Sequence, residues 1–384
     1  MKIVIAPDSF KGCLNTIGVC QALARGVRRV APDADVVAIP MADGGEGTIE
    51  ALVASGRGRI VTVTVTGPLG EPVEASYGVL DEGNKAVIEM AAASGLPLVP
   101  VERRNPMQTT TFGTGELIRH ALQSGRREFI IGIGGSATTD GGAGMAQALG
   151  VQFQVNGVPV SVPMTGALLG SITAVDATAL MPEVRASRFV VACDVDNPLL
   201  GPRGAARVYG PQKGATPEQC ETLDRNLEHY IERVEQETGR RVRDIPGAGA
   251  AGGLGAGLMA FLQARLTPGV DIVLEQTDFL RRIQGASLIL TGEGQIDFQT
   301  AFGKTPAGVA RAARTQRIPV VAVAGSVGRG ADALRDIGIE ACFPICPGPM
   351  TLEESMRRAP ELLEATAERI MRLYALAAAP SRIG

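Results

Sequence analysis

Tryptophan is absent from this chain of 384 residues, and histidine occurs only twice. His120 and His229 both lie in stretches with helical periodicity, where a lone histidine is usually a surface or packing residue. A serine–histidine–aspartate triad and a histidine-ligated metal are therefore disfavoured. Acid–base chemistry in this protein must come from Asp, Glu or Lys side chains.

Other absences restrict the class of protein. The six cysteines form no CxxC pair, which favours reduced thiols over a disulfide framework or a zinc site. No apolar run reaches the ~18 residues of a membrane helix, and the first residues become polar too soon for a signal peptide. The net charge of −3 provides no basic field for nucleic acid. We therefore expect a cytoplasmic protein without membrane or nucleic-acid partners.

The length and the 45% of hydrophobic residues suit about two globular domains. Both ends of the chain alternate short apolar runs with amphipathic helical stretches, which predicts α/β domains with a doubly wound, mainly parallel sheet. The expected strands are 2–6, 36–39, 287–290, 319–324 and 341–345, and the expected helices are 14–30, 307–315 and 351–378, the last with a break near Pro360.

The middle of the chain has a different pattern. Residues 61–66 and 74–79 alternate like a hairpin across 67–70, and Asn156-Gly157 is a strong signal for a second hairpin. We therefore expect a second α/β domain with β-hairpins, residues 67–284, inserted into a Rossmann-like α/β domain made of 1–66 plus 285–384.

The middle of the chain also contains apolar runs at 129–133 and 189–193 that we expect to be strands. Carboxylates follow these two strands and the strands at 2–6, 36–39 and 287–290, mostly beside glycine. In parallel α/β sheets, ligands bind beyond the carboxyl ends of the strands, so these acids predict a polar site. Capping of the next helix is the competing explanation for any one of them. The acids and the basic residues near them are Asp8 with Lys11, Asp43 with Glu46, Asp140, Asp194 with Asp196, and Glu293 with Asp297 and Lys304.

Two glycine-rich loops precede helices, at 132–144 and 246–257. Such loops let backbone N–H groups approach phosphate oxygens, although close packing or a flexible lid would also explain the second one. Both loops contain GxGxx(G/A) strings. The first loop follows an expected strand but lacks the ribose-binding acid of a dinucleotide site, and the second loop lacks the preceding strand. A Walker A loop ending at Lys304 is excluded because Phe298 stands where that motif needs glycine.

Many carboxylates, a few lysines and two glycine loops suit phosphoryl transfer. That reaction requires positioning, Mg²⁺ held by acids, cations on the phosphates and a carboxylate near the attacking hydroxyl. The residues by themselves therefore indicate a kinase-like or other phosphate-handling α/β enzyme.

At these same residues the chain resembles the type 1 glycerate kinase family, the D-glycerate 2-kinases, over essentially its whole length. Two positions depart from the family pattern, with Cys13 where serine is usual and Thr139 where asparagine is usual. The resemblance rests on seven blocks in order: 6–12, 42–48, 134–142, 193–199, 212–215, 246–257 and 291–304.

This resemblance implies two α/β domains with the active site in the cleft between them. It also implies the reaction of ATP with D-glycerate, assisted by Mg²⁺, with 2-phosphoglycerate favoured over 3-phosphoglycerate. Such enzymes act late in glyoxylate, glycolate or glucarate catabolism. The resemblance leaves open whether the chain forms a homodimer.

Residue roles follow as hypotheses from charge and position. Lys11 and Ser9 would hold the glycerate carboxylate or a phosphate, whereas Lys213 and Lys304 would neutralise the transferring phosphoryl group. Asp194 and Asp297 are the expected Mg²⁺ ligands and activators of the hydroxyl, in an undetermined order. The other expected substrate-binding residues are Asp8, Asp43, Glu46 and Glu293, and the expected phosphate-binding residues are Gly134, Gly135, Ser136, Gly249, Gly252, Gly253 and Gly255.

Two other functions remain open at this point. A nicotinamide-dependent oxidoreductase of a small hydroxy acid predicts nicotinamide binding and a hydride-linked absorbance change. A sugar-acid sensor without turnover predicts ligand-induced closure and no release of ADP.

Overall fold

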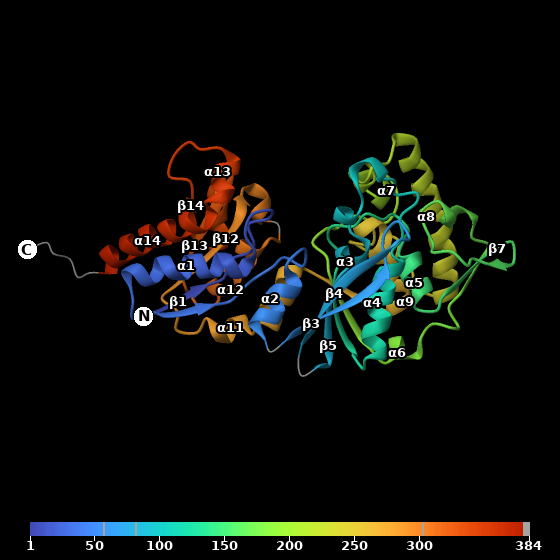
Figure 1. Cartoon of the computed structure of the whole chain (residues 1–384), viewed down its shortest axis with the longest axis horizontal. Helices are drawn as coiled ribbons and strands as arrows, with labels where there is room; N and C mark the ends of the chain where they lie inside the picture. The colour runs from blue at the N-terminus through green and yellow to red at the C-terminus, as the bar shows by residue number, and fades with distance from the viewer. Residues whose placement is uncertain (57, 81–82, 302, 379–384) are drawn as a thin grey trace, which may run out of the picture. The chain divides into compact units, whose positions relative to one another are not determined.

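The computed structural model describes residues 1–56, 58–80, 83–301 and 303–378. The chain divides into two compact units, which are shown in Figure 1. Unit 1 contains Met1–Asp43, Glu50–Gly56 and Val270–Gly384, and unit 2 contains Gly44–Ile49 and Arg57–Gly269. Within the described residues, no helix combines the length and hydropathy of a membrane span.

Unit 1 is built on a five-stranded sheet with the order β14-β13-β12-β1-β2, in which every neighbouring pair is parallel. Its strands are β1 (Lys2–Ile5), β2 (Asp35–Ala38), β12 (Leu288–Ile296), β13 (Val320–Val327) and β14 (Ile339–Pro344). Its helices are α1 (Thr16–Val30), α2 (Thr48–Ser55, in this unit from Glu50), α10 (Gly269–Gln276, in this unit from Val270), α11 (Phe279–Arg282), α12 (Thr305–Arg314), α13 (Leu352–Arg357) and α14 (Ala359–Ala378), with 3₁₀ turns at Phe298–Ala301 and Ala331–Ile337.

The sheet of unit 1 is wound in two directions from its centre. The chain passes from β1 through α1 to β2 on one side, and from β12 through α12 to β13 on the other. Because parallel crossovers are right-handed, these two connections place α1 and α12 on opposite faces of the sheet. The doubly wound parallel sheet predicted from the sequence is therefore confirmed, and its switch point lies between β1 and β12.

Helices α1 and α14 run side by side in unit 1 (Figure 1). They approach so closely that a Cβ atom on Gly26 would lie 2.2 Å from the carbonyl oxygen of Glu364. Arg25 donates to Glu364 across this contact at 2.7 Å. The predicted break near Pro360 is present, since α13 ends at Arg357 and α14 begins at Ala359.

Unit 2 contains a six-stranded sheet with the order β11-β10-β6-β5-β4-β3, parallel from β11 to β5 and antiparallel from β5 to β3. A second sheet has the order β8-β7-β9. The strands are β3 (Arg59–Thr66), β4 (Pro72–Leu80), β5 (Lys85–Glu89), β6 (Glu128–Gly132), β7 (Gln152–Val155), β8 (Val158–Pro159), β9 (Ala174–Asp176), β10 (Arg188–Ala192) and β11 (Arg265–Thr267).

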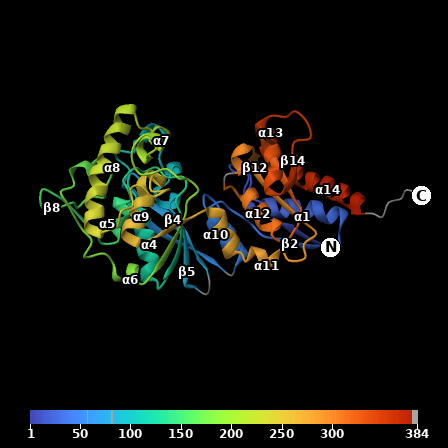
Figure 2. The same ribbon diagram turned by 180° about the vertical axis from the view of Figure 1, so that it is seen from behind.

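The helices of unit 2 surround a core separate from that of unit 1. Figure 2 shows α8 and α9 close together in this unit, with α5 against α9. The helices are α3 (Ala91–Ser94), α4 (Phe112–Gln123), α5 (Ala143–Ala148), α6 (Pro182–Arg185), α7 (Ala205–Tyr209), α8 (Pro217–Thr238) and α9 (Leu254–Leu262), with 3₁₀ turns at Leu96–Leu98, Val101–Arg103, Leu168–Ser171, Pro211–Lys213 and Ala250–Gly253.

Both predicted hairpins form in unit 2. Strands β3 and β4 pair in antiparallel register, and β7 pairs with β8 around Asn156 and Gly157. These two turn residues have φ angles of 51° and 78°, as a two-residue hairpin turn requires. Both histidines pack as expected: His120 Nδ1 lies 3.0 Å from the hydroxyl of Tyr77, and His229 Nε2 lies 2.7 Å from the carbonyl oxygen of Ile172.

Two expectations differ from the structure in detail. We expected residues 59–66 in the Rossmann-like domain, but β3 pairs with β4 and these residues belong to unit 2. We expected residues 270–284 in the inserted domain, but they belong to unit 1. The strand expected at 287–290 is longer in the structure, where β12 extends to Ile296 and pairs with β13 through Glu293 and Gln295. Glycine in a paired strand allows close approach of the neighbouring backbone, and a Cβ on Gly292 would lie 2.2 Å from the carbonyl oxygen of Val323.

Candidate active site

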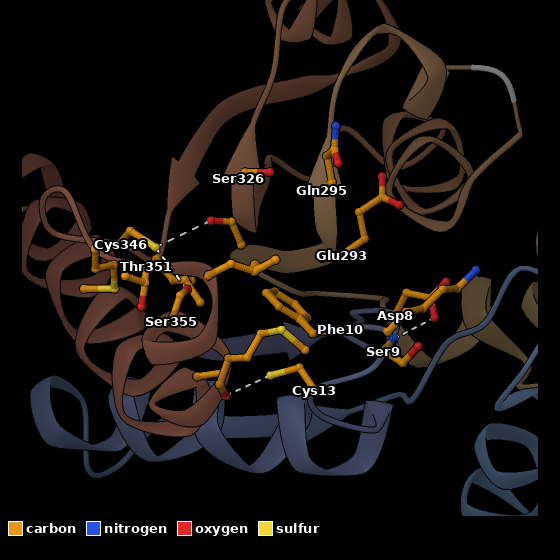
Figure 3. A pocket seen from close by; sticks show the side chains of 18 of the residues that line it. Asp8, Ser9, Phe10, Cys13, Glu293, Gln295, Ser326, Cys346, Thr351 and Ser355 are labelled. Atoms are coloured by element: carbon orange, nitrogen blue, oxygen red, sulfur yellow. Dashed lines mark hydrogen bonds between the residues drawn. The ribbon is translucent and has the colours of Figure 1, made fainter.

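A cavity of about 670 Å³ opens in unit 1, lined by residues that follow β1 and residues at the end of β12. These two strands flank the switch point of the sheet, where ligands of doubly wound proteins bind. In Figure 3, Phe10 lies between Asp8 and Ser9 on one side and Cys346 and Ser355 on the other. One end of the cavity is therefore charged and the other is lined by apolar and sulfur-containing side chains.

Asp8 is the most deeply buried acid of the charged end, with 4% of its surface exposed. Its Oδ2 accepts a hydrogen bond of 2.6 Å from the Thr305 hydroxyl, and its Oδ1 accepts one of 2.6 Å from the backbone N–H of Ser9. Burial and the nearby charge of Asp43 raise the pKa of Asp8 to about 7, although the hydrogen bonds and Lys11 oppose the shift. Asp8 can therefore exchange a proton near neutral pH.

Lys11 supplies a cation at the mouth of the cavity. Its Nζ lies 3.3 Å from Asp43 Oδ2, and 60% of its side chain is exposed. Burial lowers the pKa of Lys11, but attraction to Asp43 and Asp8 outweighs that effect and leaves the pKa above its ordinary value. Lys11 stays protonated at neutral pH and is accessible to an anionic ligand.

A second ion pair lies at the charged end. Lys304 Nζ is 3.3 Å from Glu293 Oε2, and the hydroxyl of Thr300 donates to Glu293 Oε1 at 2.6 Å. Burial raises the pKa of Glu293, while Thr300 and Lys304 partly offset the increase. Lys304 precedes α12, so its position is set by the start of that helix.

Six of the residues predicted from the sequence line this one cavity: Asp8, Ser9, Lys11, Asp43, Glu293 and Lys304. Asp297 is not among the lining residues that the structure describes. Its backbone N–H donates to Thr300 at 3.2 Å, and its Oδ2 accepts from Gln295 at 3.1 Å. Its role therefore stays a prediction.

Unit 2 holds the other predicted carboxylates. Asp194 follows β10 and is exposed, and its Oδ1 accepts a hydrogen bond of 3.0 Å from the backbone N–H of Gly269. Glu46 is exposed in the loop before α2. Both positions suit contact with a ligand, and both roles stay predictions.

Lys213 occupies a different environment from the one expected for a lysine that contacts substrate. It is 2% exposed, and its Nζ donates a hydrogen bond of 2.6 Å to the carbonyl oxygen of Thr138. Burial lowers its pKa to about 7, while the charge of Asp140 acts in the opposite direction. Lys213 therefore supports the 134–142 loop from within the core of unit 2.

Asp140 matches the helix-capping explanation of the strand-end acids. It is fully buried and accepts hydrogen bonds from the N–H and hydroxyl of Thr111, each at 2.7 Å, and from the N–H groups of Gly142 and Gly144 at the start of α5. Burial nevertheless keeps the pKa of Asp140 above its ordinary value. This acid stabilises the loop and the helix start.

The Gly134–Gly135 turn of the first glycine loop differs in packing from the second loop. Gly134 and Gly135 are exposed, and a Cβ atom on either would meet no atom closer than 3.4 Å. The Gly249, Gly252 and Gly255 positions are closed, since a Cβ there would lie 1.9–2.4 Å from the carbonyl oxygens of Pro198, Thr138 and Gly247. A Cβ on Gly253 would lie 2.8 Å from Leu199. Close packing, which the sequence left as an alternative, accounts for the glycines of the second loop.

Within residues 1–56, 58–80, 83–301 and 303–378, no three His, Cys, Asp or Glu side chains are grouped as a metal site. Mg²⁺ in kinases is held by one or two carboxylates together with phosphate oxygens, so it does not require such a group. Asp194 and Asp297 each carry carboxylate oxygens, the ligands that Mg²⁺ prefers, and their role as Mg²⁺ ligands stays a prediction.

Sequence reasoning missed the uncharged end of the cavity. Its side chains include Phe10, Ile345, Cys346, Met350 and Met356. Most come from the segment after β14, which has no carboxylate and only one glycine and therefore lacks the sequence pattern of a charged or phosphate-binding site. The available signal was the position of that segment beyond the end of a predicted strand.

The family model described as the Glycerate kinase family matches residues 3–375. The chain belongs to the glycerate kinase family. It is 52% identical to a glycerate kinase of Bacillus subtilis over 96% of this chain and 97% of the relative, and 49% identical to a glycerate 2-kinase of Escherichia coli over 94% of each. A crystal structure described as a candidate glycerate kinase 2 of Salmonella typhimurium has a TM-score of 0.89 at 46% identity, covering 98% of this chain and 99% of that one.

Membership of the glycerate kinase family makes this chain a phosphotransferase. The resemblance inferred from the seven sequence blocks is thereby confirmed, and so is the α/β fold class. The charged residues that line the cavity can therefore be related to phosphoryl transfer.

Proposed function

We propose that this protein catalyses the ATP-dependent phosphorylation of D-glycerate and releases 2-phosphoglycerate and ADP. The observation that carries the proposal is the charged end of the unit 1 cavity, where Asp8 and two lysine–carboxylate pairs line one space. The names of the relatives support glycerate as the acceptor, and the glycerate 2-kinase supports the 2-phosphate as the product.

Asp8 is the residue best suited to accept the proton of the attacking hydroxyl. A general base works best when its pKa lies near the operating pH, and burial brings the pKa of Asp8 to about 7. Proton acceptance also removes the like-charge repulsion with Asp43 that raises this pKa.

Lys11 and Lys304 provide positive charge for anionic groups of the substrates. Each is held by a carboxylate at 3.3 Å and lines the same cavity. Cations positioned before the reaction stabilise the charge that spreads over the transferring phosphoryl group, and they require no rearrangement in the transition state. We assign Ser9, Asp43 and Glu293 to the orientation of these lysines and of the substrate.

Asp194 and Asp297 remain our proposed Mg²⁺ ligands. Mg²⁺ bound by carboxylates and phosphate oxygens would neutralise negative charge on the nucleotide. The exposed Gly134–Gly135 turn, with Ser136 beside it, is the proposed glycine-loop contact for phosphate, and Glu46 the proposed contact for a glycerate hydroxyl or the metal. For Lys213 the buried hydrogen bond to Thr138 supports an indirect role, in which it positions the 134–142 loop.

We further propose that the protein acts in the cytoplasm on small molecules alone, at a late step in the breakdown of glycolate- or glucarate-type acids. A homodimer is compatible with this function, and sedimentation of the purified protein would establish the assembly.

The test is a coupled assay of ADP release with D-glycerate, ATP and Mg²⁺, in which the product is passed to enolase with or without phosphoglycerate mutase. We expect ADP release and direct use of the product by enolase. A requirement for the mutase would indicate the 3-phosphate. Absence of ADP release from folded protein would refute glycerate as the acceptor.

A further inference from the structure

We propose that the uncharged end of the unit 1 cavity binds the adenine base of ATP, with the phosphates directed toward Lys11 and Lys304. This inference rests on the proposed function, because it takes ATP as the phosphoryl donor. It assigns the nucleotide to unit 1 and gives a role to the segment between β14 and α13.

The cavity has room for a ligand larger than the acceptor. Its volume is about 670 Å³, within the range of sites that enclose a ligand of nucleotide size. Glycerate is a three-carbon acid covered by oxygen atoms, so it would match only the charged end. A ligand with a planar apolar part and an anionic tail matches both ends at once.

The uncharged end has the chemistry of a site for an aromatic ring. Phe10 and Ile345 are buried at 4% and 1% exposure, and the thioethers of Met350 and Met356 lie on the same lining. Sulfur and aromatic groups make favourable, adaptable contacts with the face of a ring. Leu352 stands on this lining with 76% of its surface exposed, which leaves an apolar side chain at the rim for a ligand to cover.

Hydrogen-bonding groups are also present at this end. The Ser355 hydroxyl lies 3.1 Å from Cys346 Sγ, and Ser326 contributes an exposed hydroxyl at the end of β13. A few polar groups on a mostly apolar wall are what orient a ring with polar edges. The edge of adenine carries both donors and acceptors, so these hydroxyls can serve it.

The second glycine loop of unit 2 gives no comparable space. Neighbouring atoms already fill the volume that side chains at Gly252 and Gly253 would need, namely the backbone of Thr138 and the side chain of Leu199. The charged end in unit 1, by contrast, presents two lysines on one lining with the apolar wall. The lysines place the phosphates, and the ring is then directed away from them toward Cys346.

Cysteine labelling of the intact protein tests the location of the base. Cys346 lines the uncharged end, whereas Cys342 and Cys193 are partly exposed and lie outside the lining. The protein is treated with a maleimide, and modification of each thiol is followed by peptide mass spectrometry. At an ATP concentration ten times its dissociation constant, we expect Cys346 to react about tenfold more slowly and the other two thiols to be unchanged.

Two further ligands separate the base from the phosphates. The occupancy of tripolyphosphate is measured by its competition with labelled ATP in equilibrium dialysis. Bound tripolyphosphate should leave Cys346 fully reactive, and D-glycerate should do the same. Equal protection by tripolyphosphate, or no protection by bound ATP, would overturn the assignment. Because occupancy is measured by dialysis, these outcomes do not depend on turnover, and a failure of glycerate phosphorylation would be recognised separately.

A pair of substitutions checks the same assignment by kinetics. Cys346→Phe fills the uncharged end and should raise the KM for ATP by about tenfold or more, with the KM for D-glycerate within about twofold of wild type. Cys342→Phe makes the same change on β14 outside the cavity and should leave both KM values unchanged. An unaltered KM for ATP in folded Cys346→Phe protein would contradict the proposal.

Discussion

The hydroxyl of Thr305 donates a hydrogen bond of 2.6 Å to Asp8 Oδ2, which joins residues 297 positions apart in the sequence. Thr305 is the first residue of α12, and Asp8 follows β1, so the bond links the two halves of the doubly wound sheet at its switch point. It also stabilises the charged form of Asp8, which opposes the effect of burial on the pKa.

Thr305→Val should shift the pH profile of the reaction. The hydrogen bond lowers the pKa of Asp8, so its removal raises that pKa, and the acid limb of kcat/KM should move up by about one pH unit. Thr315→Val removes a similar bond, to Ala312 at the exposed end of α12, and should leave the profile in place. If the wild type, Thr305→Val and Thr315→Val all gave the same pH profile, Asp8 would be excluded as the titrating group.

Asp8→Asn should lose most turnover and gain stability above neutral pH. The folded protein binds the proton of Asp8 more tightly than the unfolded chain, because the folded pKa is about 7 and the ordinary value is 3.8. Stability contributed by this group therefore falls as pH rises from about 4 to 7, and a neutral amide avoids the loss. Urea unfolding at pH 8 should show the variant about 1–2 kcal/mol more stable.

Asp196→Asn is the matched control for that measurement. Asp196 is 74% exposed and paired with Arg203, so its neutralisation should change stability little at any pH. If Asp8→Asn were instead less stable than wild type at pH 8, the raised pKa of Asp8 would be refuted.

Lys213→Met should destabilise unit 2. The substitution removes the 2.6 Å hydrogen bond to Thr138 and leaves Asp140 buried without the nearby cation, at a cost of about 2–4 kcal/mol. Lys2→Met is the control, since the partly exposed Lys2 also donates to a backbone carbonyl, that of Gln284. Urea unfolding compares them, and equal stability of the two variants would show that Lys213 has no structural role.

Gly252→Ala should destabilise the protein by about 3 kcal/mol or more, because its Cβ would lie 1.9 Å from the carbonyl oxygen of Thr138. Gly201→Ala separates this clash from backbone strain: its φ of +82° is similarly left-handed, but no atom lies within 4 Å of the added Cβ. We expect only about 1 kcal/mol for Gly201→Ala in thermal or urea unfolding. Equal losses at the two positions would mean that strain, and not packing, selects Gly252.

Asp194→Asn and Asp297→Asn should fold normally and raise the Mg²⁺ concentration needed for half-maximal turnover by about tenfold or more. Loss of a carboxylate charge weakens Mg²⁺ binding, so excess Mg²⁺ should restore part of the activity. The measurement is a Mg²⁺ titration at fixed ATP. An unchanged titration with near-normal turnover would remove that residue from the metal site.

The sequence alone determined the fold class and the charged residues of the site. Apolar runs alternating with amphipathic helices specify a parallel sheet, because that pattern buries both faces of each strand. Asp8, Lys11, Asp43, Glu293 and Lys304 were found because a parallel sheet brings the carboxyl ends of its strands to one edge.

Only the tertiary structure decided the burial and the pKa of each of these groups. The sequence could not distinguish the exposed Lys11 from the buried Lys213, or an open glycine loop from a packed one, because burial depends on residues distant in the chain. The raised pKa of Asp8 has the same origin, since Asp43 and the surrounding core come close to Asp8 only on folding. The apolar end of the cavity likewise required the fold, because Phe10 and Cys346 carry no local signal of a shared site and are joined only when β1 and β14 enter one sheet.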